Sequence, residues 1–264
     1  MSTADELPPV YQRVIRGRAE AFVWRDAAPW LESVLDTGIR AWASAQGAGS
    51  GTRFGGRGPV YVVAAPRPGP DARAEWVVRH YQRGGLAAPL LGDRYLVAGV
   101  ARPLAEIRAS VEARRRGVRT PAVIAGVVYS GLAGAFYRAD LVTELVPGVR
   151  SLSDVLFGES DRRERVIAPA EALRQAGRMV RRLADAGVQH ADLNAGNVLV
   201  DAGAREAWVV DLDRCRFLDA RAGALAATML RRLERSLRKL GAAHGRTIHE
   251  DELAGLRGAY QEDG

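Results

Sequence analysis

The stretch QHADLNAGNVLVDAGAREAWVVDLD, from Gln189 to Asp213, decides the fold assignment of this 264-residue chain. It contains two short aliphatic runs, NVLVD and AWVVD, joined by the polar turn AGARE, and this pattern predicts a β-hairpin. Asp192 and Asn197 lie in the loop before the first strand, and Asp211 lies at the end of the second strand. In a hairpin, the start of the first strand lies beside the end of the second strand. We therefore expect these three side chains to lie at one end of the hairpin.

The types and spacing of these residues are typical of phosphoryl-transfer chemistry. Mg²⁺ prefers oxygen ligands and usually keeps one or two carboxylates together with substrate phosphates. The spacing D-x-x-x-x-N from Asp192 to Asn197 is that of kinase catalytic loops, in which the Asp accepts the hydroxyl proton and the Asn binds a metal ion. Asp211 would then bind metal like the aspartate of D-F-G. A loop in which Asp and Asn only cap turns is the alternative interpretation.

The remaining sequence predicts a β-rich first part and a helix-rich second part. Strand-like residues occupy 60–66, 74–81, 122–130 and 136–146. Helical periodicity covers 30–42, 102–117, 169–187 and 220–240. A break near Pro147 separates the parts, so we predict an α+β protein with one domain over residues 1–146 and another over 147–264.

Composition is ordinary for a soluble globular protein. Hydrophobic residues make up 47% and charged residues 26% of the chain, and no run reaches the roughly 18 apolar residues of a membrane span. The one cysteine, Cys215, excludes an internal disulfide framework. The opening MSTADELPPV lacks the basic-then-apolar order of a signal peptide. We therefore expect a cytoplasmic protein.

The charge is positive, at 38 − 31 = +7. Such a charge suits nucleic acid, an anionic membrane surface or phosphorylated small molecules. Aromatic residues are only 6% and do not interleave with the basic residues, and no zinc-finger or RNA-binding signature occurs, so nucleic acid is disfavoured. Lys239 is the only lysine, so chemistry that usually needs lysine must use arginine or be absent.

HADLNAGNVLVD followed by WVVDLDRCR resembles the lipopolysaccharide kinases of Gram-negative bacteria, in particular the 3-deoxy-D-manno-octulosonic acid (Kdo) kinases. Three further matches extend the resemblance to about residues 47–220: VVRHYQRGG at 77–85, DRYLVAGVARPLAEI at 93–107 and YRADLVTELVPG at 137–148. The resemblance implies a two-lobed, protein-kinase-like fold. The N-lobe would contain an antiparallel sheet and an N-terminal helical extension, and the C-lobe would be mainly helical. It also implies transfer of phosphate from ATP, with Mg²⁺, to the 4-hydroxyl of the Kdo sugar on lipid A during lipopolysaccharide core biosynthesis.

The resemblance also assigns roles to individual residues. Asp192 would be the catalytic base, and Asn197 and Asp211 the metal ligands. Arg79 would bind nucleotide phosphates where protein kinases use lysine, and Glu106 would pair with it. If the resemblance did not extend to them, Arg79 and Glu106 would be ordinary surface charges.

The remaining implied contacts concern the nucleotide. Gly55, Gly56 and Gly58 would form a turn over the phosphates, since glycine lets backbone N–H groups approach a phosphate closely. The glycines are not in clean G-x-G-x-x-G order, so a plain flexible loop is the alternative. Glu144 and Val146 would lie in the hinge that contacts adenine through its backbone.

Departures from protein kinases narrow the function. Ala191 replaces the arginine of H-R-D, and Asp213 replaces the glycine of D-F-G. These changes argue against a regulated protein kinase and favour a small-molecule or glycolipid kinase. We expect His190 to brace the catalytic loop rather than to act as a base.

Three alternatives remain open: a kinase for another sugar or small-molecule hydroxyl, a nucleotide-binding pseudokinase, and, less supported, a nucleic-acid binder. The expected partner is a Kdo–lipid A type glycolipid, with no obligate protein partner. The basic stretch RRLERSLRK, at 231–239, or the cluster Arg114–Arg116 would dock the enzyme on an anionic inner membrane leaflet. A solvated helix face is the alternative interpretation of the same charges.

Overall fold

The fold is taken from a computed structural model, which describes residues 6–46, 60–82, 93–96, 99–131, 135–158, 167–203, 206–219 and 223–261. The chain divides into two compact units. The first comprises residues 1–111 and 121–146, and the second comprises 112–120 and 147–264. Residues 112–120, which the sequence prediction put in the first domain, therefore group with the second. One unit is built on an antiparallel sheet and the other is mainly helical, so the predicted α+β class is confirmed.

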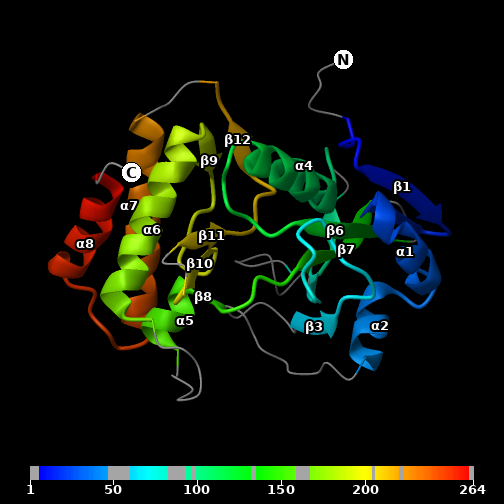
Figure 1. The fold of residues 1–264 in the computed structure, drawn as a ribbon, viewed down its shortest axis with the longest axis horizontal. Coiled ribbons are helices and arrows are strands. Elements are labelled where there is room, and N and C mark those ends of the chain that lie inside the picture. Colours follow the sequence, from blue (N-terminus) through cyan, green and yellow to red (C-terminus); the bar gives the residue numbers. More distant parts are fainter. Residues whose placement is uncertain are drawn as a thin grey trace. The chain divides into compact units, whose positions relative to one another are not determined.

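A seven-stranded sheet forms the centre of the first unit (Figure 1). All its pairings between described strands are antiparallel, in the order β1-β2-β6-β7-β4-β3, and β5 pairs with β7. The strands are β1 (Tyr11–Arg16), β2 (Ala19–Trp24), β3 (Val60–Ala64), β4 (Glu75–His80), β5 (Tyr95–Leu96), β6 (Val123–Ser130) and β7 (Phe136–Glu144). Strands β3, β4, β6 and β7 lie where they are predicted. The hairpin β1–β2 was not predicted because only Tyr11 of β1 is buried, which weakens the alternation of apolar and polar residues.

Helices cover both faces of this sheet. One face is covered by α1 (Ala28–Val34) and α2 (Ile39–Ala45). There the Trp30 ring packs edge to face against two others, with ring centroids 5.1 Å apart for Trp42 of α2 and 4.8 Å apart for Trp76 of β4. On the other face, α4 (Arg102–Arg115) packs Ile107 into a cluster with residues of β2, β6 and β7. The predicted helix over 30–42 is divided in two because Gly38 adopts a φ of +86°.

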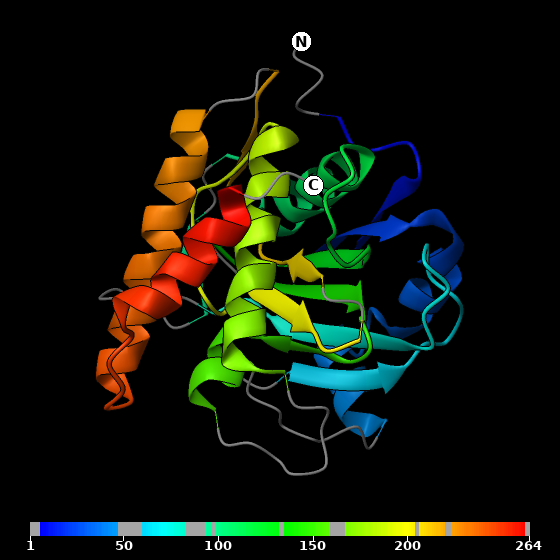
Figure 2. The same ribbon diagram turned by 60° about the vertical axis from the view of Figure 1, so that its left-hand side comes forward.

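Among the described residues, the second unit contains four whole helices, the last turn of α4 and two small sheets (Figure 2). Its helices are α5 (Leu152–Phe157), α6 (Pro169–Asp185), α7 (Gly223–Ala243) and α8 (Glu250–Gln261). Its strands are β8 (Val149–Ser151), β9 (Val188–His190), β10 (Val198–Asp201), β11 (Ala207–Val209) and β12 (Cys215–Phe217), paired as β11-β10-β8 and β12-β9. The predicted hairpin is thus β10–β11. Among the described residues, no helix is both long and apolar enough to cross a membrane.

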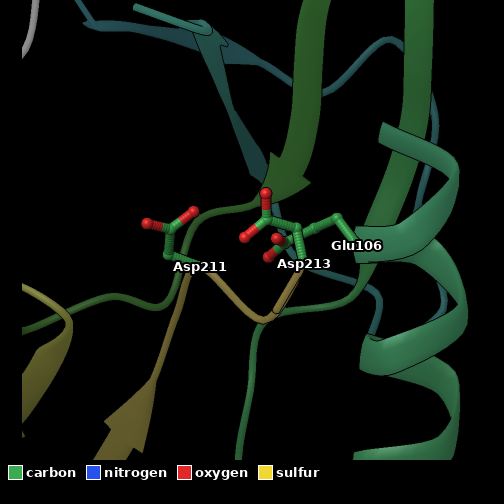
Figure 3. A group of neighbouring side chains, drawn as sticks. All are labelled: Glu106, Asp211 and Asp213. Atoms are coloured by element: carbon green, nitrogen blue, oxygen red, sulfur yellow. The ribbon is translucent and has the colours of Figure 1, made fainter. Parts of the chain in front are cut away.

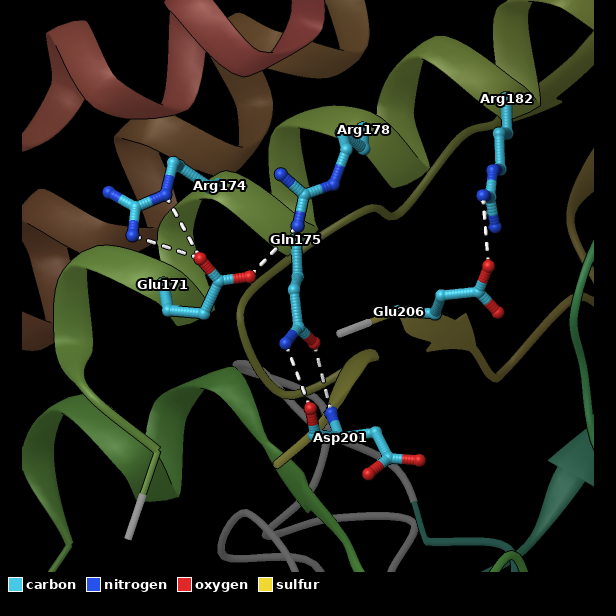
Figure 4. Close-up of polar contacts among 7 residues, drawn as sticks. All are labelled: Glu171, Arg174, Gln175, Arg178, Arg182, Asp201 and Glu206. Atoms are coloured by element: carbon cyan, nitrogen blue, oxygen red, sulfur yellow. Dashed lines mark hydrogen bonds and ion pairs between the residues drawn. The ribbon is translucent and has the colours of Figure 1, made fainter. Parts of the chain in front are cut away.

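Gln175, a buried residue of α6, fixes the hairpin to that helix (Figure 4). Its Nε2 donates to the carbonyl of Asp201 at 2.8 Å, and its Oε1 accepts from the amide of Asp201 at 3.0 Å. Arg182, one turn from the end of α6, donates to Glu206 on the other arm of the hairpin at 3.1 Å. Both arms of the hairpin are therefore held to α6.

The crossing of α6 and α8 depends on Gly177. A Cβ at this position would lie 2.2 Å from the carbonyl oxygen of Leu256 and 3.2 Å from Cβ of Ala259. Gly177→Ala should therefore lower the free energy of unfolding by about 2 kcal/mol, because overpacking outweighs the helix propensity that alanine adds. Urea denaturation measures the change. Gly255→Ala on α8 is the matched control: nothing lies within 4 Å of its added Cβ, so it should be neutral or stabilise by up to ~1 kcal/mol. Equal effects of the two substitutions would contradict the prediction.

The last turn of α4 belongs to the second unit and carries a pH-dependent contact. The carboxylate of Glu112 accepts from Arg115 Nε at 2.7 Å and from Arg116 Nε at 2.6 Å. Arg116 in turn donates to the carbonyls of Ala186 and Leu218, at 3.0 and 2.7 Å. The hydrogen bond from Arg115, helped by Arg116 and opposed by partial burial, lowers the pKa of Glu112 from 4.5 to about 2.

A carboxylate with a lowered pKa in the folded state stabilises the protein above its unfolded pKa and ceases to do so as the pH falls. We expect Glu112→Gln to reduce the free energy of unfolding by about 1 kcal/mol near neutral pH, since the group is solvent-screened. The difference from the unsubstituted chain should shrink as the pH falls from 4.5 to about 2. Urea denaturation at several pH values measures it, and a pH-independent difference would refute the linkage.

Candidate active site

The predicted catalytic loop runs from β9 to β10 in the second unit and closes on itself through Asn197. This residue is only 4% exposed. Its Nδ2 donates to the carbonyl of Asp192 at 3.2 Å, and its backbone N–H donates to the carbonyl of Asn194 at 3.0 Å. Its own carbonyl accepts from the amide of Val210 at 3.0 Å. Asn197 therefore joins the loop that begins at Asp192 to the end of the neighbouring β11 segment.

Asn194 and α7 hold the middle of the loop. The side chain of Asn194 donates to the carbonyl of Asp192 at 2.8 Å and accepts from the amide of Gly196 at 2.9 Å. The amide of Ala195 donates to Oγ of Ser236 on α7 at 3.2 Å. Several hydrogen bonds therefore fix the backbone of the loop, as positioning catalysis requires.

Asp211 lies directly after the β11 segment in an uncommon backbone conformation. Its φ is +66°, in the left-handed region that aspartate tolerates better than most residues, and it is 7% exposed. Figure 3 shows Asp211 and Asp213 on the segment that follows β11. The bond from Val210 to Asn197 puts Asp211 one residue from the closed end of the loop. The hairpin thus brings the backbones of Asn197 and Asp211 to one end, two of the three residues predicted to meet there.

His190 braces this arrangement. It is 1% exposed, its Nε2 donates to the carbonyl of Val210 at 3.0 Å, and its Nδ1 accepts from the amide of Asp192 at 3.3 Å. These two bonds assign the neutral tautomer with the proton on Nε2. Burial lowers the pKa of His190, which keeps the ring neutral. The imidazole therefore joins the residue before Asp211 to the backbone of Asp192.

The carboxylate of Asp192 has one partner that the sequence analysis missed. Nη1 of Arg214 lies 2.9 Å from its Oδ2. The two side chains are 65% and 47% exposed, in that order. Arg214 comes directly after D-L-D, and its place next to a predicted metal-binding motif was the available signal.

In the first unit, the predicted pair of Arg79 and Glu106 lies together. Arg79 is the last but one residue of β4. Its Nη2 lies 3.5 Å from Oε1 of Glu106, and its guanidinium carbon lies 5.2 Å from the centre of the Tyr81 ring. Glu106, on α4 (Figure 3), is 4% exposed. A buried carboxylate needs such a cationic neighbour, so neither residue is an ordinary surface charge. Their role toward a nucleotide stays a prediction.

A partly buried polar network that we did not predict adjoins Arg79. Nδ1 of His80 lies 2.5 Å from Oδ1 of Asp140, and its Nε2 lies 3.0 Å from Oδ2 of Asp93. Arg138 donates to the other oxygen of Asp93 at 2.8 Å. Burial raises the pKa of Asp93, but the bonds from His80 and Arg138 outweigh it and leave the pKa below its usual value. The network fixes β4 to β7 next to Arg79, and its members lie in the three further stretches that resemble the family, 77–85, 93–107 and 137–148.

The predicted nucleotide contacts have mixed outcomes. Gly55, Gly56 and Gly58 lie outside the described residues. Val146 is the buried last residue of the first unit, and its backbone role stays a prediction.

Glu144 has a use that the sequence did not indicate. Its carboxylate accepts from the amides of Asp71 and Arg73, at 3.0 and 3.2 Å, and its own N–H donates to the carbonyl of Ala122 at 2.9 Å. A Cβ at Gly69 would lie 2.2 Å from this carboxylate. The side chain of Glu144 thus anchors the turn between β3 and β4, and the adenine contact through its backbone stays a prediction.

The donor set of the second unit fits a divalent cation. The side-chain nitrogen of Asn197 donates a hydrogen bond to Asp192, so its Oδ1 is the atom that could bind a metal ion. Asp211 has a carboxylate. Oxygen ligands of this kind suit Mg²⁺. His190 has committed both ring nitrogens to backbone groups, so it supplies no ligand.

The chain is similar to several known proteins. The chain is similar to a solved structure described as WaaP in complex with acyl carrier protein, at 21% identity and a TM-score of 0.46, covering 89% of this chain and 88% of that one. It is 36% identical to a 3-deoxy-D-manno-octulosonic acid kinase of Stenotrophomonas maltophilia (strain K279a), over 78% of this chain and 76% of the relative. It is 37% identical to a protein of the same name from Xanthomonas euvesicatoria pv. vesicatoria (strain 85-10), over 78% of this chain and 77% of the relative.

The family model described as Lipopolysaccharide kinase (Kdo/WaaP) family matches residues 56–254, which include the catalytic loop, Asp211 and the pair of Arg79 and Glu106. The resemblance inferred from the sequence is confirmed, together with the phosphotransferase activity that it implies. The chain belongs to the lipopolysaccharide kinase (Kdo/WaaP) family.

Proposed function

We propose that this chain transfers the γ-phosphoryl group of ATP to the 4-hydroxyl of the Kdo sugar of Kdo–lipid A. The observation that carries the proposal is the pair of hydrogen bonds made by the His190 ring in a chain of this family. They join the backbone of Asp192 to that of Val210, the residue before Asp211. The choice of acceptor is supported by the relatives named Kdo kinase.

Asp192 acts on the acceptor. The sugar oxygen attacks the γ-phosphorus, the bond from that phosphorus to the bridging oxygen of ADP breaks, and the hydroxyl proton passes to the Asp192 carboxylate. The half-exposed carboxylate is accessible to an acceptor, while its backbone is held by Asn194, Asn197 and His190. The loop thereby supplies orientation, which is most of the catalysis in phosphoryl transfer.

Asn197 and Asp211 would hold Mg²⁺ through one amide oxygen and one carboxylate. A bound magnesium ion would neutralise charge on the phosphates. Two features orient these ligands: the left-handed backbone conformation of Asp211, and the hydrogen bond from the side-chain amide of Asn197 to the carbonyl of Asp192.

Arg79 would bind the nucleotide phosphates in place of lysine. Its guanidinium can bond phosphate oxygens in pairs, and the buried Glu106 holds it in position. The backbones of Glu144 and Val146 would contact adenine, and Gly55, Gly56 and Gly58 would cover the phosphates.

The test is an ATP–Mg²⁺ reaction with a Kdo-bearing lipid A precursor, and the Kdo-free precursor as control, followed by mass spectrometry. We expect one added phosphate, only on the Kdo-bearing lipid, and fragmentation that locates it at the 4-hydroxyl. Addition to the Kdo-free precursor would overturn the assigned acceptor. If no phosphate were added while ATP still bound, the proposed kinase activity would be refuted and a nucleotide-binding pseudokinase would be favoured.

Because the acceptor is a lipid, we also propose cytoplasmic, peripheral contact with an anionic membrane through α7. Arg231, Arg232 and Arg235 of this helix are exposed. The other basic cluster is partly engaged, since Arg114 donates to the carbonyl of Thr120 and Arg116 to two carbonyls. The exposed row on α7 is therefore the favoured contact.

Charge reversal of Arg231, Arg232 and Arg235 to Glu should weaken binding to vesicles containing anionic lipid by roughly 100-fold, since each basic residue near the surface contributes about 1 kcal/mol. Co-sedimentation at low ionic strength measures the loss. Reversal of three exposed arginines of the first unit, Arg13, Arg16 and Arg18, makes the same change in net charge. Equal losses in both triple variants would point to net charge alone and would contradict docking by α7.

A further inference from the structure

We propose that Arg214 binds the carboxylate of the acceptor sugar next to the reacting hydroxyl, and so selects an acidic sugar. The inference rests on the proposed function and deepens it. It starts from the contact between Nη1 of Arg214 and Oδ2 of Asp192, 2.9 Å apart within the second unit.

The fold holds Arg214 beside the base. Cys215 of β12 lies opposite His190 of β9 in an antiparallel pair, so the preceding residue, Arg214, lies beside the chain that leads to Asp192. The amide of Cys215 also donates to the carbonyl of Leu212 at 2.8 Å, which closes the turn from Leu212 to Cys215. The backbone is therefore fixed on both sides of Arg214, while its side chain extends toward solvent.

The contact itself contributes little to stability. Its partners are 65% and 47% exposed, and exposed ion pairs of this kind are worth only about 0–1 kcal/mol. An incoming anion can therefore take the guanidinium at small cost. The guanidinium carries five N–H donors in a planar fork, so it can bond a carboxylate in pairs while it stays near the base.

The position of Arg214 restricts which anion it meets. A group that reaches Oδ2 of Asp192 also reaches substituents on the same ring as the attacking hydroxyl. The proposed acceptor is a sugar acid, and its carboxylate is ionised at neutral pH. The phosphates of the lipid are the other anions of the substrate, but they lie on a different part of the molecule from the reacting sugar.

The experiment compares kcat/KM for the Kdo-bearing acceptor with that for its carboxylate methyl ester. We expect the unsubstituted chain to prefer the free acid by roughly 10- to 100-fold, the value of a hydrogen-bonded charge pair. Arg214→Gln should lose this preference and bring the acid down to the level of the ester, mainly through KM, while the KM for ATP stays unchanged. Arg214→Lys should restore part of the preference.

Arg216→Gln is the matched control. Arg216 is an exposed arginine of β12, and its substitution removes the same charge two residues away from Arg214. It should keep the preference for the acid. A third acceptor, with the lipid phosphates removed, separates the two sources of negative charge: if its use no longer depends on Arg214, the carboxylate assignment is wrong.

Other outcomes also overturn the inference. Equal use of acid and ester by the unsubstituted chain would do so, as would an Arg214→Gln variant that slows both acceptors alike, because the residue would then act through Asp192. Each of these requires a phosphorylated product, whereas failure of the proposed function would show as no product with any Kdo-bearing acceptor.

Discussion

Asp211→Asn should lower kcat by at least about 10³-fold while the protein remains folded. The substitution removes the carboxylate proposed to hold the metal ion, whose charge stabilisation is worth several kcal/mol. Asparagine is the informative replacement because Asp211 has a φ of +66°, and asparagine tolerates this left-handed conformation as well as aspartate does. The variant should therefore lose the charge and keep the turn.

Phosphate transfer measured over a range of Mg²⁺ concentrations tests this prediction. The variant should stay slow even at saturating Mg²⁺, with a free energy of unfolding within about 1 kcal/mol of the unsubstituted chain. Asp219→Asn is the control, since Asp219 is an exposed acid that follows β12. If Asp211→Asn kept more than a tenth of the activity, Asp211 would not be the principal metal ligand.

Asp192→Ala should lower kcat by about 10²- to 10⁴-fold, the contribution of a positioned general base. ATP binding should be retained, because the groups that organise the loop bond to the backbone of Asp192 rather than to its side chain. Asn194 and Asn197 bond to its carbonyl, and His190 bonds to its amide. Alanine preserves these three bonds, so the loss should appear in the chemical step.

Single-turnover kinetics with saturating ATP separate this effect from binding. A normal rate would refute the role of Asp192 as base. Asn194→Ala is a useful comparison because it removes two bonds within the loop, to Asp192 and Gly196, and leaves the carboxylate in place. It should reduce the rate less than Asp192→Ala does, since several other bonds still hold the loop.

Local patterns were sufficient for much of the fold. Strands β3, β4, β6 and β7, the hairpin β10–β11 and helices α4, α6 and α7 lie where periodicity and turn residues predict them. The elements that were missed are short or little buried, such as β1, β9 and β12, or are interrupted by glycines, such as α8. Their pattern of apolar residues is too short to be distinguished from that of a loop.

The sequence by itself determined which residues can do the chemistry. The order His190, Asp192, Asn197 and Asp211 around two strands depends on neighbours in the chain, and a hairpin necessarily brings its two ends together. The same holds for the type of ligand, since carboxylate and amide oxygens suit Mg²⁺ wherever they meet.

Only the tertiary structure decided which partner each side chain takes. Arg214 meets Asp192 because β12 pairs with β9, and the carboxylate of Glu144 binds a turn that lies more than 70 residues away in the chain. His80 finds Asp140 across 60 residues through the pairing of β4 and β7. Contacts at such separations follow from packing of the whole unit, and no local pattern of hydrophobicity or charge specifies them.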